Sequence, residues 1–278
     1  MKKLTGISLF TLFALFAAFS IFAISNDIQF APESAPEFYF TRLVFSENGW
    51  RNRRTMPMPS EQFTCPEFGG GNFFPRQGWG WATDYPGADC KFMGGVHRLT
   101  GMRVHANPNV IDIMDPKLFD FPYVYAVEVG GLVLSEEEAA RLRDYLLRGG
   151  FLHVDDFWGR WQLENFEEEM KKVFPDRAIK DLPMTHAAFH TFFDIDAVMQ
   201  VPNRTNGCYG ERTWEQPDDT EPRILGIADD SGRLMVAVTY NSDLGDAWEY
   251  MDLPCYPEIF SGYAYRIGIN FMIYAMTH

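Results

Sequence analysis

The chain has few basic residues for its length. Its 278 residues include 24 lysines and arginines against 38 aspartates and glutamates, a formal net charge of −14 at pH 7. Binding to nucleic acid without regard to sequence needs a basic surface, and so does docking on anionic lipid headgroups. We therefore predict no nucleic-acid partner, and membrane contact only through the N-terminal segment described below.

Cysteine is also scarce, and internal repeats and low-complexity tracts are absent. No C-x-x-C spacing indicates zinc, and we assign no metal ligands and no cofactor. An even number of cysteines in an exported chain permits two disulfides with three possible pairings, whereas free, partly buried thiols are the alternative. The four residues are Cys65, Cys90, Cys208 and Cys255.

Charge is missing from a long N-terminal stretch. Lys2 and Lys3 precede an almost wholly apolar run, Leu9–Ala23, and small residues follow at the spacing of a cleavage site. We predict that residues 1–25 are a signal peptide cleaved after Ser25. The alternative is a retained anchor, because about 21 residues can span a bilayer of about 30 Å. Either way, we expect the body of the protein in the periplasm or on the outer face of the inner membrane.

A capped helix is the clearest local signal. Ser135 and Glu138 form a capping box, in which each side chain accepts a hydrogen bond from a free backbone N–H of the first turn. Gly149 and Gly150 end the helix, because glycine adopts the left-handed conformation at no steric cost. The apolar face in between consists of Ala139, Leu142, Tyr145 and Leu146.

A short apolar strand follows this helix and leads into two carboxylates. Phe151–Val154 has the length and composition of a buried strand, and Asp155 and Asp156 come directly after it. In open α/β sheets, ligands bind outside the carboxyl ends of the strands. This strand end is therefore the first candidate for a functional site.

The remaining pattern alternates between strands and helices, which favours a mostly parallel sheet flanked by helices. A turn sequence, DDSG, separates two apolar runs near the end and predicts an antiparallel hairpin. We predict a linker at 26–36 and a single domain at 37–278. The expected elements are strands at 37–45, 102–105, 123–129, 224–228 and 234–240, helices from 86, at 164–173 and at 262–276 (capped by Ser261), and loops at 46–83, 203–219 and 241–259.

Four segments resemble a known family: EFYFTRLVF from residue 37, LSEEEAARLRDYLLRGGFLHVDD from 134, EEEMKKVFPD from 167 with LP before His186, and YRIGINFMIYAMTH from 265. They are similar to the bacterial family called domain of unknown function 4159, over about residues 37–278. The resemblance implies a three-layer, flavodoxin-like α/β sandwich related to class I glutamine amidotransferases, and export or anchoring. It supplies no reaction. True amidotransferases carry a nucleophilic cysteine in a G-x-C-x-G turn where this chain has Asp155 and Asp156, so thioester chemistry is excluded there.

Several residue groups are candidates for chemistry, and each also has a structural interpretation. Asp155 and Asp156 suit a metal site or an acid/base pair, or else they cap the next turn. His186 and His190 have helical i,i+4 spacing, with His153 near the aspartates, but hydrogen-bonded core histidines are the alternative.

Further candidates surround that strand end. Asp246 and Glu249, with Asp243, either add carboxylates to the same cleft or form turns and caps. Arg42 and Arg266 are charges in apolar segments, and we expect each to meet a carboxylate, with Asp155 and Asp156 as candidates. Trp158 and Trp161 either form an aromatic platform for a carbohydrate ligand, or they are lid and core residues.

Two functions follow. The first is a non-catalytic binding or scaffold module of the cell envelope, with an envelope protein, a small molecule or a carbohydrate as its partner. It is favoured because no complete set of nucleophile, base and orienting group can be identified. The alternative is a carboxylate- or metal-dependent hydrolase with Asp155, Asp156 and His186 as its catalytic residues and Arg42, His153, Trp158, His190, Asp246, Glu249 and Arg266 around the ligand.

Overall fold

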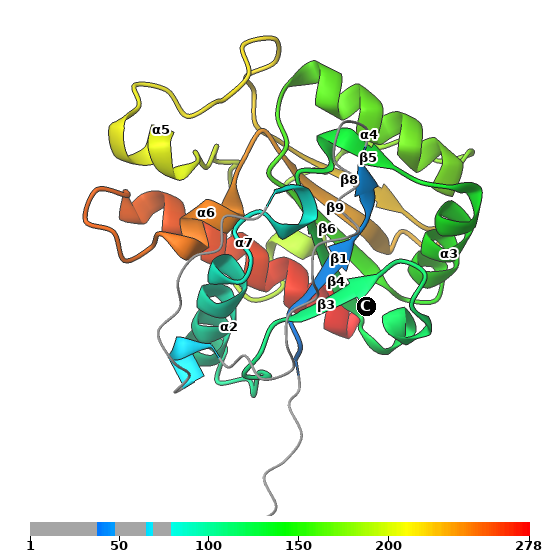
Figure 1. Ribbon diagram of the computed structural model, residues 1–278, viewed down its shortest axis with the longest axis horizontal. Coiled ribbons are helices and arrows are strands. Elements are labelled where there is room, and N and C mark those ends of the chain that lie inside the picture. The colour runs from blue at the N-terminus through cyan, green and yellow to red at the C-terminus, as the bar shows by residue number, and fades with distance from the viewer. Residues whose placement is uncertain (1–37, 48–64, 69–78) are drawn as a thin grey trace, which may run out of the picture. The chain divides into compact units, whose positions relative to one another are not determined.

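A computed structural model describes residues 38–47, 65–68 and 79–278 (Figure 1). The predicted signal or anchor, 1–25, and the linker, 26–36, lie outside the described residues. Among the helices in the described part of the chain, none combines the length and apolarity that a membrane span requires.

One seven-stranded sheet forms the centre of the described residues, in the order β3-β1-β4-β6-β9-β8-β7. The strands β3, β1, β4, β6 and β9 run parallel, whereas β8 is antiparallel to both of its neighbours. This confirms the predicted mostly parallel sheet with an antiparallel hairpin. The bounds are β1 Thr41–Val44, β3 Asn109–Asp112, β4 Tyr123–Val127, β6 Phe151–Asp155, β7 Lys180–Asp181, β8 Arg223–Ala228 and β9 Leu234–Tyr240, and a separate pair joins β2 Ser46–Glu47 to β5 Leu132–Val133.

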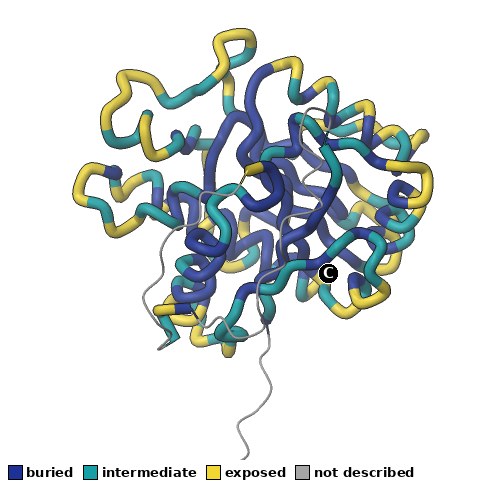
Figure 2. The backbone as a smooth tube through the Cα atoms, in the orientation of Figure 1, coloured by how far each residue is buried: buried dark blue, intermediate teal, exposed yellow. Residues whose placement is uncertain are grey.

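Helices cover both faces of the sheet (Figure 1). Side chains alternate along β4, so that Tyr125 packs into one hydrophobic cluster and Val124 into the other. The first cluster includes residues of α2 Gly87–Thr100, α6 Leu244–Glu249 and α7 Glu258–Thr277, and the second includes residues of α3 Glu136–Leu147 and α4 Gly159–Val173. Figure 2 shows the buried centre of the sheet, which consists of the wholly buried strands β1, β4, β6 and β9. The shorter helices are α5 Arg204–Tyr209 and the 3₁₀ turns η2 Pro66–Phe68, η3 Gly80–Ala82, η4 Pro116–Asp120, η5 Val129–Gly131 and η6 Ala187–Phe189.

The capped helix is confirmed in detail. Ser135 Oγ accepts from the Glu138 N–H, and Glu138 Oε2 accepts from the Ser135 N–H at 2.8 Å. Gly149 adopts φ 110° just beyond the helix. The strand that follows begins at Phe151, as predicted, and its apolar residues are buried on both faces.

Three predicted elements were wrong, and the last helix is confirmed with an earlier start than predicted. Residues 102–105 form only a single bridge, from Val104 to Phe38, and the strand beside β1 is β3 instead. The predicted loops 203–219 and 241–259 contain α5 and α6, each capped by the residue before it. The last helix begins at Glu258 rather than after Ser261, because Pro257 precedes it in an extended conformation and Ser261 is buried within the helix.

All four cysteines form disulfides, Cys65 with Cys90 and Cys208 with Cys255. Of the two alternatives that the sequence left open, the structure has the two disulfides and not the free thiols. The first bond joins the residue directly before η2 to α2, and the second joins α5 to the segment before α7.

Candidate acidic site

The carboxyl ends of three neighbouring strands are tied together by backbone hydrogen bonds. Glu128 follows β4, and its N–H donates to the carbonyl oxygens of Asp155 at 3.3 Å and Asp156 at 3.1 Å. The Asp156 N–H donates in turn to the carbonyl of Ser242, just after β9, at 3.1 Å. Because the strands are parallel, the residues that leave them meet at one edge of the sheet.

Backbone strain is concentrated at the same edge. Among the described residues, four that are not glycine have positive φ: Asp84 (60°), Glu128 (56°), Asp156 (52°) and Asn241 (54°). Three of them follow β4, β6 and β9. This left-handed conformation is uncommon outside glycine, and such strain clusters at functional sites in proteins.

Five carboxylates converge here, and together they are called the acidic site: Asp84, Asp156, Asp243, Asp246 and Glu249. One oxygen each from Asp84, Asp156 and Asp243 lies within 4.8 Å of the others. The same holds for Asp84, Asp246 and Glu249, so Asp84 belongs to both groups. Asp156 and Asp243 are buried, whereas the other three are half-buried.

Local packing brings these side chains close to the helices α2 and α6. A Cβ on Gly87 would lie 2.3 Å from Glu249 Oε1, and a Cβ on Gly245 would lie 2.6 Å from Asp84 Oδ2. Asp84 Oδ2 is itself buried, and no N–H or hydroxyl group in the described part of the chain donates to it. Asp243 caps α6 by accepting from the Asp246 N–H at 2.7 Å, so the predicted capping role and the cleft position coexist.

The electrostatics reflect this crowding. Burial is the main reason why the pKa values of Asp84, Asp156 and Asp243 lie well above the ordinary range, and neighbouring negative charges raise them further. Burial, followed by the charge of Asp246, raises the pKa of Glu249 to about 7. The site therefore favours bound protons or a bound cation.

A family model described as Domain of unknown function (DUF4159) matches residues 75–276. The chain belongs to this family. The predicted family is thereby confirmed, although the segment EFYFTRLVF at 37–45 lies outside the matched residues. The match includes every carboxylate of the acidic site. A search of curated proteins finds no match.

In this DUF4159 chain, Asp155 and Asp156 have different environments although they are adjacent. Asp155 is fully buried and accepts four hydrogen bonds, from the hydroxyls of Tyr125 and Thr239 and from the N–H groups of Leu244 and Gly245. Burial raises its pKa to about 6 although these bonds lower it. Asp155 therefore fastens β6 to β4, β9 and the start of α6, and Asp156 alone reaches the acidic site.

Trp158 and Arg42 support the acidic site from outside it. Trp158 is buried, and its Nε1 donates to Asp156 Oδ1 at 2.9 Å, which orients that carboxylate. Arg42 is buried and pairs with Asp89, Nη2 to Oδ2 at 3.0 Å. Its Nη1 also donates to the carbonyls of Trp81 and Thr83, directly before Asp84.

The two predicted arginine pairs turned out differently. Arg42 meets a carboxylate as predicted, although that carboxylate is Asp89 rather than Asp155 or Asp156. The prediction for Arg266 was wrong: its side chain is exposed, its Nε donates to the Gly262 carbonyl, and no carboxylate of the described residues pairs with it. The solvent-facing side of α7 explains why this charge needs no partner.

The histidines lie elsewhere. Among the described residues, no histidine belongs to a group whose ligand atoms are close enough to share a cation. His153 is fully buried, its Nδ1 is 2.8 Å from the Tyr123 hydroxyl, and burial lowers its pKa to about 3. His190 bonds to the Met184 carbonyl and to Asp194.

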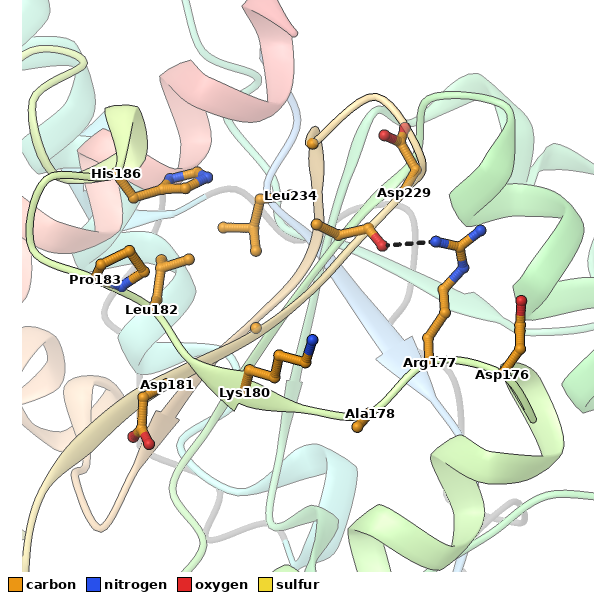
Figure 3. A pocket seen from close by; sticks show the side chains of 13 residues that line it. Asp176, Arg177, Ala178, Lys180, Asp181, Leu182, Pro183, His186, Asp229 and Leu234 are labelled. Carbon is orange, nitrogen blue, oxygen red and sulfur yellow. Dashed lines mark hydrogen bonds between the residues drawn. The ribbon is translucent and has the colours of Figure 1, made fainter.

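His186 belongs to a separate surface cavity of about 430 Å³ (Figure 3). Its Nδ1 accepts from the Ala188 N–H at 3.1 Å, which caps η6, and its ring lies near Tyr274. The cavity also has Lys180 and Arg177 on its wall, and the Arg177 guanidinium donates to Asp230. The structure thus brings Asp156, Asp246 and Glu249 together and leaves His186, His190 and His153 outside.

Asp84 is the member of the acidic site that the sequence did not predict. It lies in the turn between η3 and α2, far from the strand ends in sequence. The only local signal is an aspartate at a D-Y-P-G turn, a pattern that indicates a turn without any reference to a ligand.

Proposed function

We propose that this DUF4159 chain is an exported divalent-cation-binding module of the cell envelope. Its fold would be flavodoxin-like and amidotransferase-like but without the cysteine nucleophile. Numbered along the chain, the five parallel strands have the order 2-1-3-4-5, which is the flavodoxin-like order and supports this fold. Two disulfides and the apolar segment at 1–25 support export.

The convergence of Asp84, Asp156 and Asp243 carries the proposal. At an effective dielectric constant of about 20, two unit charges 4.8 Å apart repel by about 3.5 kcal/mol. Among the described residues, Arg42 is the buried cation near this site, but its guanidinium is bonded to Asp89. A bound cation would turn this mutual repulsion into shared attraction.

The chemistry of the donors favours a hard cation. Carboxylate oxygens suit Ca²⁺, Mn²⁺ and Mg²⁺. Opposite ligands across Ca²⁺ are about 4.6–5.2 Å apart, and across Mg²⁺ about 4.0–4.2 Å, from their usual bond lengths. Oxygens within 4.8 Å of one another therefore fit Ca²⁺ without large movement.

Calorimetric titration tests the proposal. We expect the full chain, stripped with EDTA, to bind Ca²⁺ or Mn²⁺ and to melt at a higher temperature with the cation present. Asp156→Asn should lose most of both effects. Asp120→Asn is the matched control, because Asp120 is exposed at the end of η4. The proposal would be overturned if the chain bound neither Ca²⁺ nor Mn²⁺, or if Asp156→Asn bound them as tightly as the wild type does.

A metal-dependent hydrolase is the second candidate. The observation in its favour is the position of the acidic site at the carboxyl ends of parallel strands, with Asp84, Asp246 and Glu249 half-buried rather than sealed. Asp156, not the saturated Asp155, would then act on the cation or its bound water. Cation-dependent turnover on a panel of hydrolase substrates, lost in Asp156→Asn, would establish this function in place of a purely binding role.

A further inference from the structure

We propose that the acidic site holds two divalent cations side by side, with Asp84 as the carboxylate shared between them. This inference rests on the proposed cation binding and adds to it the number of ions and the role of each. An inner cation would be held by Asp84, Asp156 and Asp243, and an outer cation by Asp84, Asp246 and Glu249.

The geometry of the two groups supports two ions rather than one. Each group of three oxygens spans no more than 4.8 Å, and only Asp84 is common to both. In two-metal sites the ions are about 3.5–4 Å apart and are commonly bridged by a shared ligand. A carboxylate has two oxygens, so Asp84 can contribute to both ions at once.

An independent observation concerns Asp84 itself. Its buried Oδ2 lies beside the start of α6, and no N–H or hydroxyl of the described residues donates to it. The group within hydrogen-bonding reach of the Asp84 side chain is the carboxyl of Asp246, another member of the acidic site. A buried carboxylate oxygen without a donor is costly, because it has lost its water without gaining a partner. A cation at this oxygen satisfies it.

Charge balance also favours two ions. The five carboxylates of the acidic site carry a formal charge of −5 when ionised. One divalent cation would leave −3 within a largely buried site, whereas two leave −1. Since buried charge is tolerated only when it is paired, the second ion removes most of the remaining penalty.

The two positions differ in exposure, which assigns them different roles. Asp156 and Asp243 are 5% and 3% exposed, so the inner cation is enclosed by protein. Asp246 and Glu249 are half-buried, so the outer cation has coordination positions open to water or to a ligand with anionic oxygens. The inner ion would exchange slowly, and the outer ion would be the one that meets a ligand.

Mn²⁺ binding to the full chain, followed by elemental analysis and electron paramagnetic resonance, tests this inference. We expect two Mn²⁺ per chain with the spectrum of a coupled pair. Glu249→Gln keeps the shape beside Gly87 and should retain one Mn²⁺, with affinity for the second reduced at least about tenfold. Asp84→Asn should lose the coupling, and Asp120→Asn should keep two ions.

The outcomes separate the two proposals. One Mn²⁺ per wild-type chain, or two without magnetic coupling, would overturn the shared site and leave cation binding intact. No bound Mn²⁺ or Ca²⁺ would overturn both. If Asp84→Asn does not fold, Glu249→Gln is the deciding variant, because this half-buried residue can change without exposing the core. Two coupled ions in Glu249→Gln would contradict the assignment of Glu249 to the outer cation.

Discussion

Substitutions at Asp155 and Asp156 should affect stability in opposite ways, although the residues are adjacent. Asp155→Ala removes the acceptor for the Tyr125 hydroxyl and for the N–H groups of Leu244 and Gly245. A buried donor left without a partner costs about 1–3 kcal/mol, so three cost about 3–9 kcal/mol. That is a large part of a typical folding free energy of about 5–15 kcal/mol.

Asparagine at position 155 should recover most of this loss. Its amide oxygen can take the place of Asp155 Oδ2, and its NH₂ can donate to Thr239 Oγ1, which still donates to the Val154 carbonyl at 3.0 Å. Asp156→Asn keeps the acceptor for Trp158 Nε1 and removes one negative charge from the acidic site. Without divalent cation at pH 7.5, we expect it to be as stable as the wild type or more stable.

Urea denaturation in EDTA, followed by tryptophan fluorescence, measures these free energies of unfolding. The expected order of stability is Asp156→Asn at least equal to wild type, then Asp155→Asn, then Asp155→Ala. A loss below about 1 kcal/mol in Asp155→Ala would contradict the structural role of Asp155. A loss in Asp156→Asn as large as that in Asp155→Ala would show that the acidic site is not repulsive.

Three further predictions concern the surrounding framework. Burial lowers the pKa of His153 to about 3, so the neutral imidazole stabilises the folded state fully above about pH 6.5. As the pH falls toward 3, the free energy of unfolding should decrease by up to about 5 kcal/mol, because protons bind the unfolded chain first. His153→Gln should flatten this part of the pH dependence in urea titrations from pH 7 to 4. Arg42→Met leaves Asp89 buried without its partner and should cost about 3–5 kcal/mol in the same assay, with recovery when Asp89→Leu is added, and no recovery would contradict the pairing. Replacing Cys208 and Cys255 by serine opens a loop of 47 positions and should lower the free energy of unfolding by about 4 kcal/mol in the chain-entropy model, whereas an equal midpoint for wild type and variant would refute the bond.

The elements that the sequence predicted well are governed by local interactions. The capping box of Ser135 and Glu138 involves residues three apart, and the hairpin turn is closed by Asp229, which accepts from the N–H groups of Ser231 and Arg233. Such contacts depend little on the rest of the fold, so the pattern of residue types is sufficient to identify them.

The missed elements depend on distant partners. β3 is a four-residue strand whose place is fixed by pairing with β1, and α6 is a six-residue helix in an acidic segment. Helices this short are not stable alone and take their stability from tertiary packing. The apolar contacts of Leu244 and Trp248 provide it here, and neither contact can be inferred from neighbouring residues.

The residues of the acidic site also divide into those that local sequence indicates and those that depend on distant partners. The rule that ligands bind at strand ends located Asp156, but it could not separate that residue from Asp155, because the difference lies in hydroxyls supplied by Tyr125 and Thr239. Asp84 was missed because the position of its turn depends on a distant residue: Arg42 of β1 donates to the carbonyls of Trp81 and Thr83, just before Asp84. The predicted histidines failed to join because three-dimensional proximity does not follow from i,i+4 spacing in an irregular segment.

The position of β1 also bears on which fragments of this chain we expect to fold. β1 lies inside the sheet, between β3 and β4, yet it precedes residue 75, where the family match begins. A fragment trimmed to residues 75–276 would have an interior gap in its sheet, an unneutralised Asp89 and a Cys90 without Cys65. We therefore expect that residues 75–276 alone do not fold and that a fragment starting upstream of Phe38, which bridges to Val104, does.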